Sequence, residues 1–189
     1  GGQLLMAVLF IPMFLAGIVM MLKNPALLRS RLKAREKEAD QDLVIKLSGL
    51  MFLVGFILAG LDFRFGWSGV PSWCVIAASV LFLVGYGLYA EVMRENAYLS
   101  RTIEVQEDQT VVDTGLYGIV RHPMYAVTLL LFLSMPLVLG SIHAFLVFLA
   151  YPFIIGKRLL AEEAFLEEHL PGYREYKQKV RYRLLPFIW

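Results

Sequence analysis

Residues 73–90, WCVIAASVLFLVGYGLYA, decide the fold class because they form an uncharged apolar run of eighteen residues. A helix that crosses the hydrocarbon core of a bilayer needs about 20 residues, with a range near 17–25. The whole chain has 189 residues, of which 58% are hydrophobic, and its mean hydropathy is +0.62. These values are too apolar for an ordinary soluble domain. We therefore expect an all-α integral membrane protein.

Other apolar runs lie on both sides of this segment. The run at 47–61 reaches membrane length if residues 43–46 join it and Lys46 extends its ammonium group to the lipid headgroups. The apolar runs at 124–139 and 142–156 are separated only by Gly140-Ser141, and we interpret them as a tight helical hairpin. A single long buried helix is the alternative, which Pro136 and Gly140 disfavour. The expected membrane spans, about five in number, are residues 4–22, 43–61, 73–90, 123–139 and 142–156.

The distribution of basic residues supports five spans with the N-terminus outside. This topology places 17 of the 18 Lys and Arg residues on the cytoplasmic side and leaves only Arg64 outside. A wrong topology rarely satisfies the positive-inside rule this well. The C-terminus is then inside. The run at 4–22 lacks the basic start and the small-residue cleavage site of a signal peptide, so we expect a retained helix.

Several classes of partner and site are disfavoured. The net charge of +2 is too small to indicate nucleic acid. We expect the basic cytoplasmic face to meet anionic lipid headgroups. The single cysteine, Cys74, excludes intrachain disulfides. Glu167-Glu168-His169 lacks a helical two-histidine spacing, so no metal site is expected. Gly85-Tyr86-Gly87 is a lone Gly-x-Gly inside a helix and most simply indicates close helix packing.

Polar side chains gather at the cytoplasmic edges of the last two spans. Pro123 fits the first turn of a helix, where its missing N–H costs nothing, and His122 lies at the cap, where free N–H groups suit an anion. In the helix expected from 157 to about 169, Arg158 and Glu162 share a face, whereas Glu163 points about 100° away. Purely structural roles remain open for these residues. Arg121 could be a headgroup anchor, His122-Pro123 a helix-start device, and Arg158 with Glu162 a surface ion pair. The candidate polar residues are Asn96, Tyr117, Arg121, His122, Tyr125, Arg158, Glu162, Glu163 and Tyr176.

The second half of the chain also contains an ordered set of short motifs. These are Thr110-Val111-Val112-Asp113-Thr114-Gly115-Leu116-Tyr117, Arg121-His122-Pro123-x-Tyr125, Lys157-Arg158-x-x-x-Glu162-Glu163, Gly172-Tyr173-x-x-Tyr176 and Leu185-Pro186-Phe187. The set resembles the isoprenylcysteine carboxyl methyltransferase family of archaeal or bacterial type, which is related to phospholipid amine methyltransferases. Val127 stands where the family often has glycine. We therefore treat residues 1–189 as a single membrane-embedded methyltransferase domain whose cofactor and catalytic half is residues 96–189, with a cytoplasmic helix and a C-terminal tail forming the cofactor site.

The resemblance implies S-adenosyl-L-methionine as cofactor and S-adenosyl-L-homocysteine as product, bound without a Rossmann domain. In this interpretation Glu163 meets the cofactor ammonium, while His122 and the helix N-terminus meet its carboxylate. No metal is involved. The implied cofactor contacts are Gly115, Leu116, Tyr117, His122, Pro123, Tyr125 and Glu163.

The resemblance further implies methyl transfer to the α-carboxylate of a prenylated (farnesyl or geranylgeranyl) cysteine or another lipid-borne acceptor. Such a carboxylate is already ionised near neutral pH, so no general base is required. Methyl transfer is favoured instead by correct orientation of the acceptor and by exclusion of water from the site. We expect Arg158 and Arg121 to hold the acceptor carboxylate and Glu162 to hold Arg158 in place.

Other functions stay open on the sequence alone. An amine N-methyltransferase that acts on phospholipid needs a neutral amine, hence a carboxylate or tyrosine placed as a base. Sterol reductases, which use a nicotinamide, also share an Arg-His-Pro region. A non-enzymatic membrane module, in which the charges only anchor helices, predicts no cofactor binding. The sequence gives neither the prenyl length nor the oligomeric state.

Overall fold

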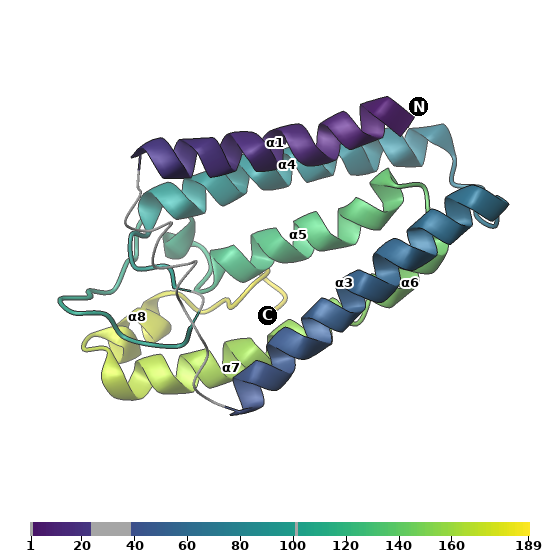
Figure 1. The fold of residues 1–189 in the computed structure, drawn as a ribbon. Helices are drawn as coiled ribbons and strands as arrows, with labels where there is room; N and C mark the ends of the chain where they lie inside the picture. Colours follow the sequence, from purple (N-terminus) through teal and green to yellow (C-terminus); the bar gives the residue numbers. More distant parts are fainter. Residues whose placement is uncertain (1, 24–38, 101) are drawn as a thin grey trace.

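The computed structural model of the chain describes residues 2–23, 39–100 and 102–189, and these residues form helices without a strand (Figure 1). Three segments are long and apolar enough to cross a membrane, namely Asp42–Phe65, Ser72–Glu95 and Ile142–His169. This confirms an all-α membrane protein, whereas the count of five spans stays a prediction. The helices are α1 (Gly2–Lys23), α3 (Ala39–Phe65), α4 (Ser72–Glu95), η1 (Gly115–Gly118), α5 (Pro123–Val138), α6 (Ile142–Phe148), α7 (Tyr151–His169) and α8 (Tyr173–Lys179).

The fourth expected span begins and ends as its local signals predict. His122 is the N-cap of α5, and Pro123 occupies its first turn. A proline there leaves no hydrogen bond unmade. After Val138 the chain turns through Gly140, whose φ is 74°. Only a residue without a Cβ adopts this conformation readily. The Ser141 side chain then caps α6 by accepting a hydrogen bond from the N–H of Ala144 at 3.0 Å. The predicted helical hairpin is therefore confirmed.

The fifth expected span is not one uniform helix. Two helices, α6 and α7, follow each other directly, and Pro152 lies in the first turn of α7. A proline cannot donate the main-chain bond that would continue α6 through this point. Beyond the break α7 runs without interruption to His169, and Gly172 with φ 83° follows. The expected extension of this helix to about residue 169 is confirmed.

The helix ends of the second and third spans differ in detail from the predictions. α3 begins at Ala39, which confirms that residues 43–46 are helical, and it ends at Phe65 rather than at residue 61. α4 ends at Glu95, because Asn96 already has an extended backbone.

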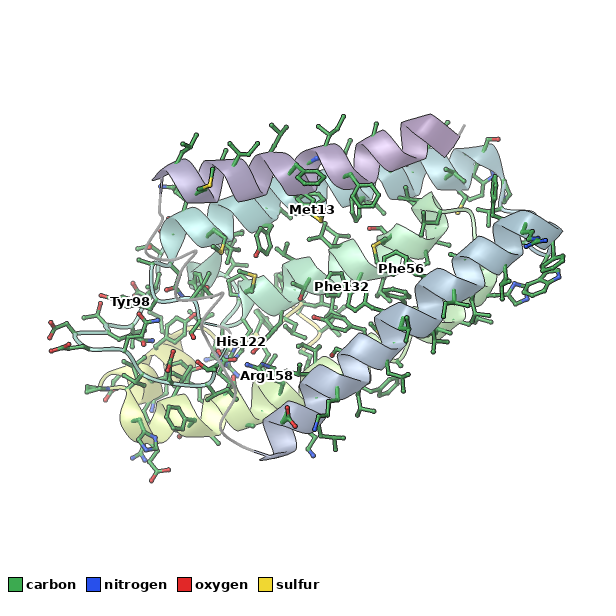
Figure 2. The ribbon with its side chains drawn as sticks, in the orientation of Figure 1. Met13, Phe56, Tyr98, His122, Phe132 and Arg158 are labelled. Atoms are coloured by element: carbon green, nitrogen blue, oxygen red, sulfur yellow. The ribbon has the colours of Figure 1, made fainter. Side chains whose placement is uncertain are left out.

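Close packing joins α4 to α5 (Figure 1). A Cβ built on Gly85 would lie 2.7 Å from Leu131 Cδ2. Only glycine permits such a close approach of two helices. This confirms the packing interpretation at Gly85, whereas Gly87 has no atom within 4 Å of such a Cβ. On the other side of the bundle α3 packs against α6 and α7. Phe132 of α5, labelled in Figure 2, contacts Phe52 of α3 edge to face.

A buried carboxylate ties the far ends of these helices together. Asp62 near the end of α3 is 2% exposed and accepts hydrogen bonds from the hydroxyls of Ser68 at 2.5 Å and Ser141 at 2.6 Å. His143 Nδ1 lies 3.1 Å from the same carboxylate. The α5–α6 turn is thereby attached to α3, which fixes the end of the bundle opposite the candidate site.

Candidate active site

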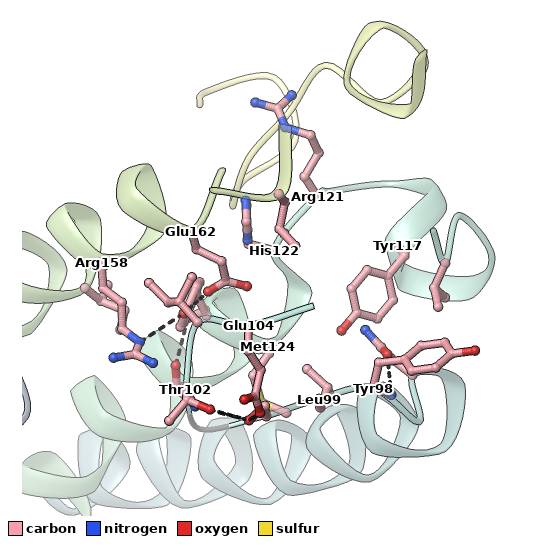
Figure 3. Close-up of a pocket in the computed structure, with 18 of the residues that line it drawn as sticks. Tyr98, Leu99, Thr102, Glu104, Tyr117, Arg121, His122, Met124, Arg158 and Glu162 are labelled. Carbon is pink, nitrogen blue, oxygen red and sulfur yellow. Dashed lines mark hydrogen bonds between the residues drawn. The ribbon is translucent and has the colours of Figure 1, made fainter. Parts of the chain in front are cut away.

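A cavity of about 610 Å³ lies at the end of the bundle where α5 begins (Figure 3). Its wall is built by α3, α4, residues 96–100 and 102–112 of the connection after α4, η1, α5, α7 and α8. Cavities of roughly 300–1,000 Å³ are typical of small-molecule sites. Of the predicted site residues, the wall includes Tyr117, Arg121, His122, Tyr125, Arg158 and Glu162 but not Gly115, Leu116, Pro123 or Glu163.

Arg121 and Glu163 form a buried ion pair beside this cavity. Nε of Arg121 lies 2.6 Å from Oε1 of Glu163, and both side chains are 4% exposed. His122 Nε2 lies 3.3 Å from the same oxygen, and Arg183 Nε donates to the other oxygen at 2.9 Å. Glu163 thus meets three basic side chains. Buried charges are tolerated when they are paired and hydrogen-bonded in this way.

The segment after α8 pairs with the start of α5 through main-chain hydrogen bonds. The N–H of Arg121 donates to the carbonyl of Tyr182, and the N–H of His122 donates to that of Arg183, both at 2.9 Å. The Arg121 guanidinium also donates to the carbonyls of Val180 and Arg181 at 2.8 Å. The tail therefore fixes the backbone and the guanidinium of the Arg-His-Pro motif.

A second polar group lines the cavity next to His122, whose ring stacks on that of Tyr125. The Tyr125 hydroxyl donates to the Glu162 carboxylate, and Arg158 Nε donates to the Tyr125 oxygen at 3.3 Å. Arg158 is only 8% exposed. Because Arg158 is buried, Arg158 and Glu162 do not form an ordinary solvent-exposed ion pair. The helical spacing placed Arg158 and Glu162 on one face, and both indeed line the cavity (Figure 3). Arg121 and Arg158 share the cavity, but Arg121 is paired with Glu163.

The Gly115–Gly118 helix brings Tyr117 to the cavity. Gly115 has φ 55°, and a Cβ there would lie 3.1 Å from Cδ of Glu95. The Thr114 hydroxyl donates to the Glu95 carboxylate, which explains why this carboxylate sits so close. The Tyr117 carbonyl accepts a 2.7 Å hydrogen bond from the hydroxyl of Tyr176. Gly115 thus shapes the turn and does not itself line the cavity.

Some residues of the wall were not predicted from the sequence. Tyr98, Thr102 and Glu104 come from the irregular connection after α4, where no periodic pattern marks which side chains point inward. Tyr173 also lines the cavity, and its buried hydroxyl has no hydrogen-bond partner among the described residues. Tyr173 belongs to the motif Gly172-Tyr173-x-x-Tyr176, but the motif alone did not indicate that its side chain lines the cavity.

Electrostatics around α8 favour neutral tyrosines that donate hydrogen bonds. Burial, followed by the nearby carboxylate of Glu163, raises the pKa of Tyr173 well above its usual range. Burial likewise raises the pKa of Tyr176. At the rim, a hydrogen bond from Lys179 lowers the pKa of Asp113. Both tyrosine hydroxyls therefore stay protonated near neutral pH and can act as donors.

The family model described as phospholipid methyltransferase matches residues 73–172, from α4 to the turn before α8. A search of curated proteins returned no match. Methyltransferases of this family are generally dependent on S-adenosylmethionine. The matched region covers more than half of the chain and includes every predicted catalytic and cofactor-contact residue, so the chain belongs to the phospholipid methyltransferase family, the family of membrane methyltransferases that resemble isoprenylcysteine carboxyl methyltransferase.

Proposed function

We propose that the chain methylates the α-carboxylate of a prenylated cysteine at the cytoplasmic face of the membrane, with S-adenosylmethionine as methyl donor. The observation that carries this proposal is the position of Arg158, which is buried in the wall of a cavity that continues along apolar side chains. The apolar part of that wall includes Val44, Ile45, Phe52 and Phe132. A guanidinium next to an apolar wall suits an acceptor with a carboxylate at one end and a hydrocarbon chain at the other.

The residues around the cavity also fit the cofactor. The His122 side chain, which lines the cavity, is a candidate donor for its carboxylate. The Tyr173 hydroxyl is a further donor without a partner among the described residues. Glu104 and Glu162 are carboxylates in the described wall that suit its ammonium group. Glu163, the contact implied by the resemblance, lies outside this wall. We assign Glu163 a positioning role, in which it holds Arg121 and His122.

The chemistry needs orientation more than proton transfer. S-adenosylmethionine, when bound, would supply an electrophilic methyl group, which the acceptor carboxylate would attack in line so that an O–CH3 bond forms as the S–CH3 bond breaks and neutral S-adenosylhomocysteine leaves. Arg158 orients that carboxylate through its planar fork, and the hydrogen bond from its Nε to Tyr125 restricts the fork to one direction. Glu162 accepts from Tyr125 and fixes the tyrosine in turn. The surrounding apolar wall keeps water away from the reacting atoms.

Methylation of a phospholipid amine is the second candidate, and Glu162 is the observation that favours it. A carboxylate in the cavity wall, hydrogen-bonded to a tyrosine hydroxyl, can take a proton from an ammonium headgroup before transfer. The description of the matched family model points in the same direction. In this case Glu162 acts as a base, whereas in carboxylate methylation it only supports Arg158 through Tyr125.

A pH profile of the Glu162→Gln variant separates the two functions. Purified protein in lipid nanodiscs is given labelled S-adenosylmethionine and either a prenylcysteine mimic or phosphatidylethanolamine. We expect base-labile methyl ester on the prenylcysteine, with a rate that stays level between about pH 7 and pH 9 for wild type and variant, because no proton is removed. If the label appears in phosphatidylethanolamine, and if high pH restores the methyl-transfer rate of the Glu162→Gln variant, the amine function would be established instead.

A further inference from the structure

Residues 184–189 form a small loop that exposes apolar side chains at the edge of the bundle. Phe187 is 87% exposed and Ile188 78%, while Leu185 and Trp189 are 49% and 40% exposed. Leu184 is buried and attaches the loop to the protein. Large apolar side chains that gather on one exposed loop mark an interaction surface.

The loop lies beside the apolar part of the helices and does not extend away from them. Leu185 lines a second cavity of about 540 Å³ together with Ala126 and Leu129 of α5 and Pro152 of α7. Pro152 precedes Arg158 by six residues, which is about 9 Å along the helix from the polar site. Figure 1 shows the chain returning toward α5 and α7 at its C-terminal end. The loop therefore lies beside Ile142–His169, a segment long and apolar enough to span a membrane, and beside the shorter apolar helix α5.

Most main-chain N–H groups of this loop are hydrogen-bonded within the loop. The N–H groups of Arg183, Leu184 and Leu185 all donate to the carbonyl of Trp189, at 2.9, 3.0 and 3.2 Å. Those of Ile188 and Trp189 donate to the carbonyl of Leu185. Pro186 has no N–H to satisfy. Internal bonding of backbone groups lowers the cost of placing a non-helical segment in a lipid environment, and these N–H groups of the loop are bonded in this way.

The same loop is connected to the buried ion pair beside the main cavity. The Arg183 guanidinium lies over the Trp189 ring, 5.4 Å from its centroid, and Nε of Arg183 donates to Glu163. The carbonyls of Tyr182 and Arg183 accept from Arg121 and His122. A displacement of the loop would therefore disturb the Arg-His-Pro motif directly.

We propose that residues 184–189 dock into the acyl-chain region of the adjacent membrane leaflet and that this docking holds Arg183 in contact with Glu163. Tryptophan and arginine suit the boundary between headgroups and hydrocarbon, and the exposed Phe187 and Ile188 suit the region below it. The lipid is the occupant because the exposed patch continues into the apolar second cavity, which lies among the same helices. The ligand site is then fully ordered only when the loop is seated in lipid.

Fluorescence of Trp189 in nanodiscs tests the docking. The chain has three tryptophans, so Trp67→Phe and Trp73→Phe leave Trp189 as the single emitter. Brominated acyl chains are expected to quench this emission about twofold or more relative to unlabelled lipid. Quenching does not depend on any methyl acceptor, so it tests the docking even if the proposed reaction is wrong. Emission that is the same in both lipids would overturn the proposal, including the case in which a second copy of the chain covers the loop.

Substitution of the exposed side chains tests the coupling to the site. Phe187→Ser with Ile188→Ser is expected to abolish quenching and to weaken S-adenosylhomocysteine binding about tenfold, because two apolar side chains no longer favour the lipid. Phe187→Leu, which stays apolar, should retain both properties and shows that the loop still folds. Phe63→Ser removes an equally exposed side chain at the far end of α3 and should change neither. Loss of quenching with unchanged cofactor affinity would refute the coupling.

Discussion

Arg121 and Glu163 are 42 residues apart in the sequence, yet Nε of Arg121 lies 2.6 Å from the Glu163 carboxylate in a buried site. The pair links the N-terminus of α5 to the second half of α7, and Arg183 adds the tail to the same carboxylate. The neighbouring Glu162 points to the cavity instead. The two adjacent glutamates of α7 therefore have separate roles. Glu163 positions Arg121, and Glu162 forms part of the cavity wall.

Glu163→Gln should destabilise the protein by about 3–5 kcal/mol, because it leaves the buried Arg121 guanidinium without its countercharge. Glu162→Gln is the matched control on the same helix, and it should cost about 1 kcal/mol or less while it lowers methyl transfer. Thermal unfolding in detergent measures both. Equal loss of stability in the two variants would contradict the division of tasks, and a double-mutant cycle with Arg121→Gln should show coupling between Arg121 and Glu163.

Arg158→Lys should fail to restore activity although it keeps the positive charge. Lysine lacks the planar fork that orients a carboxylate, and we expect a loss on the order of 10²-fold in single-turnover methyl transfer. S-adenosylhomocysteine affinity should hardly change, because Arg158 contacts the acceptor in this account. Lys157→Arg, one position earlier, serves as the control and should leave the rate intact. Near wild-type turnover of the Arg158→Lys variant would return Arg158 to a structural role.

Tyr176→Phe should lower the stability of the protein, whereas Tyr173→Phe should lower its affinity for S-adenosylhomocysteine. The Tyr176 hydroxyl donates to the Tyr117 carbonyl at 2.7 Å. Loss of this hydrogen bond should cost about 1 kcal/mol of stability. The Tyr173 hydroxyl has no partner among the described residues, and Tyr173→Phe should leave stability unchanged while it weakens S-adenosylhomocysteine binding. Unfolding curves and calorimetric titration on the two variants separate these effects. Unaltered affinity of the Tyr173→Phe variant would exclude the hydroxyl from the ligand site.

Gly115→Ala should distort the turn that carries Tyr117. Gly115 has a φ of 55°, and a Cβ at this position would also press on Glu95. A left-handed backbone costs an alanine about 1–2 kcal/mol. We expect a lower unfolding temperature together with weaker cofactor binding. Gly87→Ala is the control in α4, where a Cβ meets no atom within 4 Å. That substitution should be neutral or stabilising by about 0.5–1 kcal/mol. A Gly115→Ala variant as stable as wild type would contradict the strain argument.

The parts of the fold that local chemistry determines could be predicted from the sequence. Pro123 and His122 mark the start of α5, Gly140-Ser141 marks the hairpin, and Pro171-Gly172 follows the end of α7 because each acts on its own neighbours. The helical period also placed Arg158 and Glu162 on one face, which the cavity confirms.

The parts that depend on long-range packing could not be predicted. A period of about 3.6 residues separates Glu162 from Glu163, but it does not tell which of them faces a cavity and which faces Arg121. The contacts of Arg183 depend on the path of the tail, and no local signal encodes that path. The irregular residues 97–100 and 102–109 carry no period, so Tyr98, Thr102 and Glu104 could not be recognised as wall residues. The break between α6 and α7 has a local signal, Pro152, which the expectation of one uninterrupted span through this apolar run left unused.

Transfer of labelled methyl from S-adenosylmethionine to a farnesylcysteine mimic, compared with the same mimic whose carboxylate is capped as an amide, tests the central claim most directly. The account predicts methyl ester on the free acid and no label on the amide, because Arg158 holds an ionised carboxylate as the acceptor. Absence of label on the free acid, with label recovered in phosphatidylethanolamine from the same nanodiscs, would contradict it.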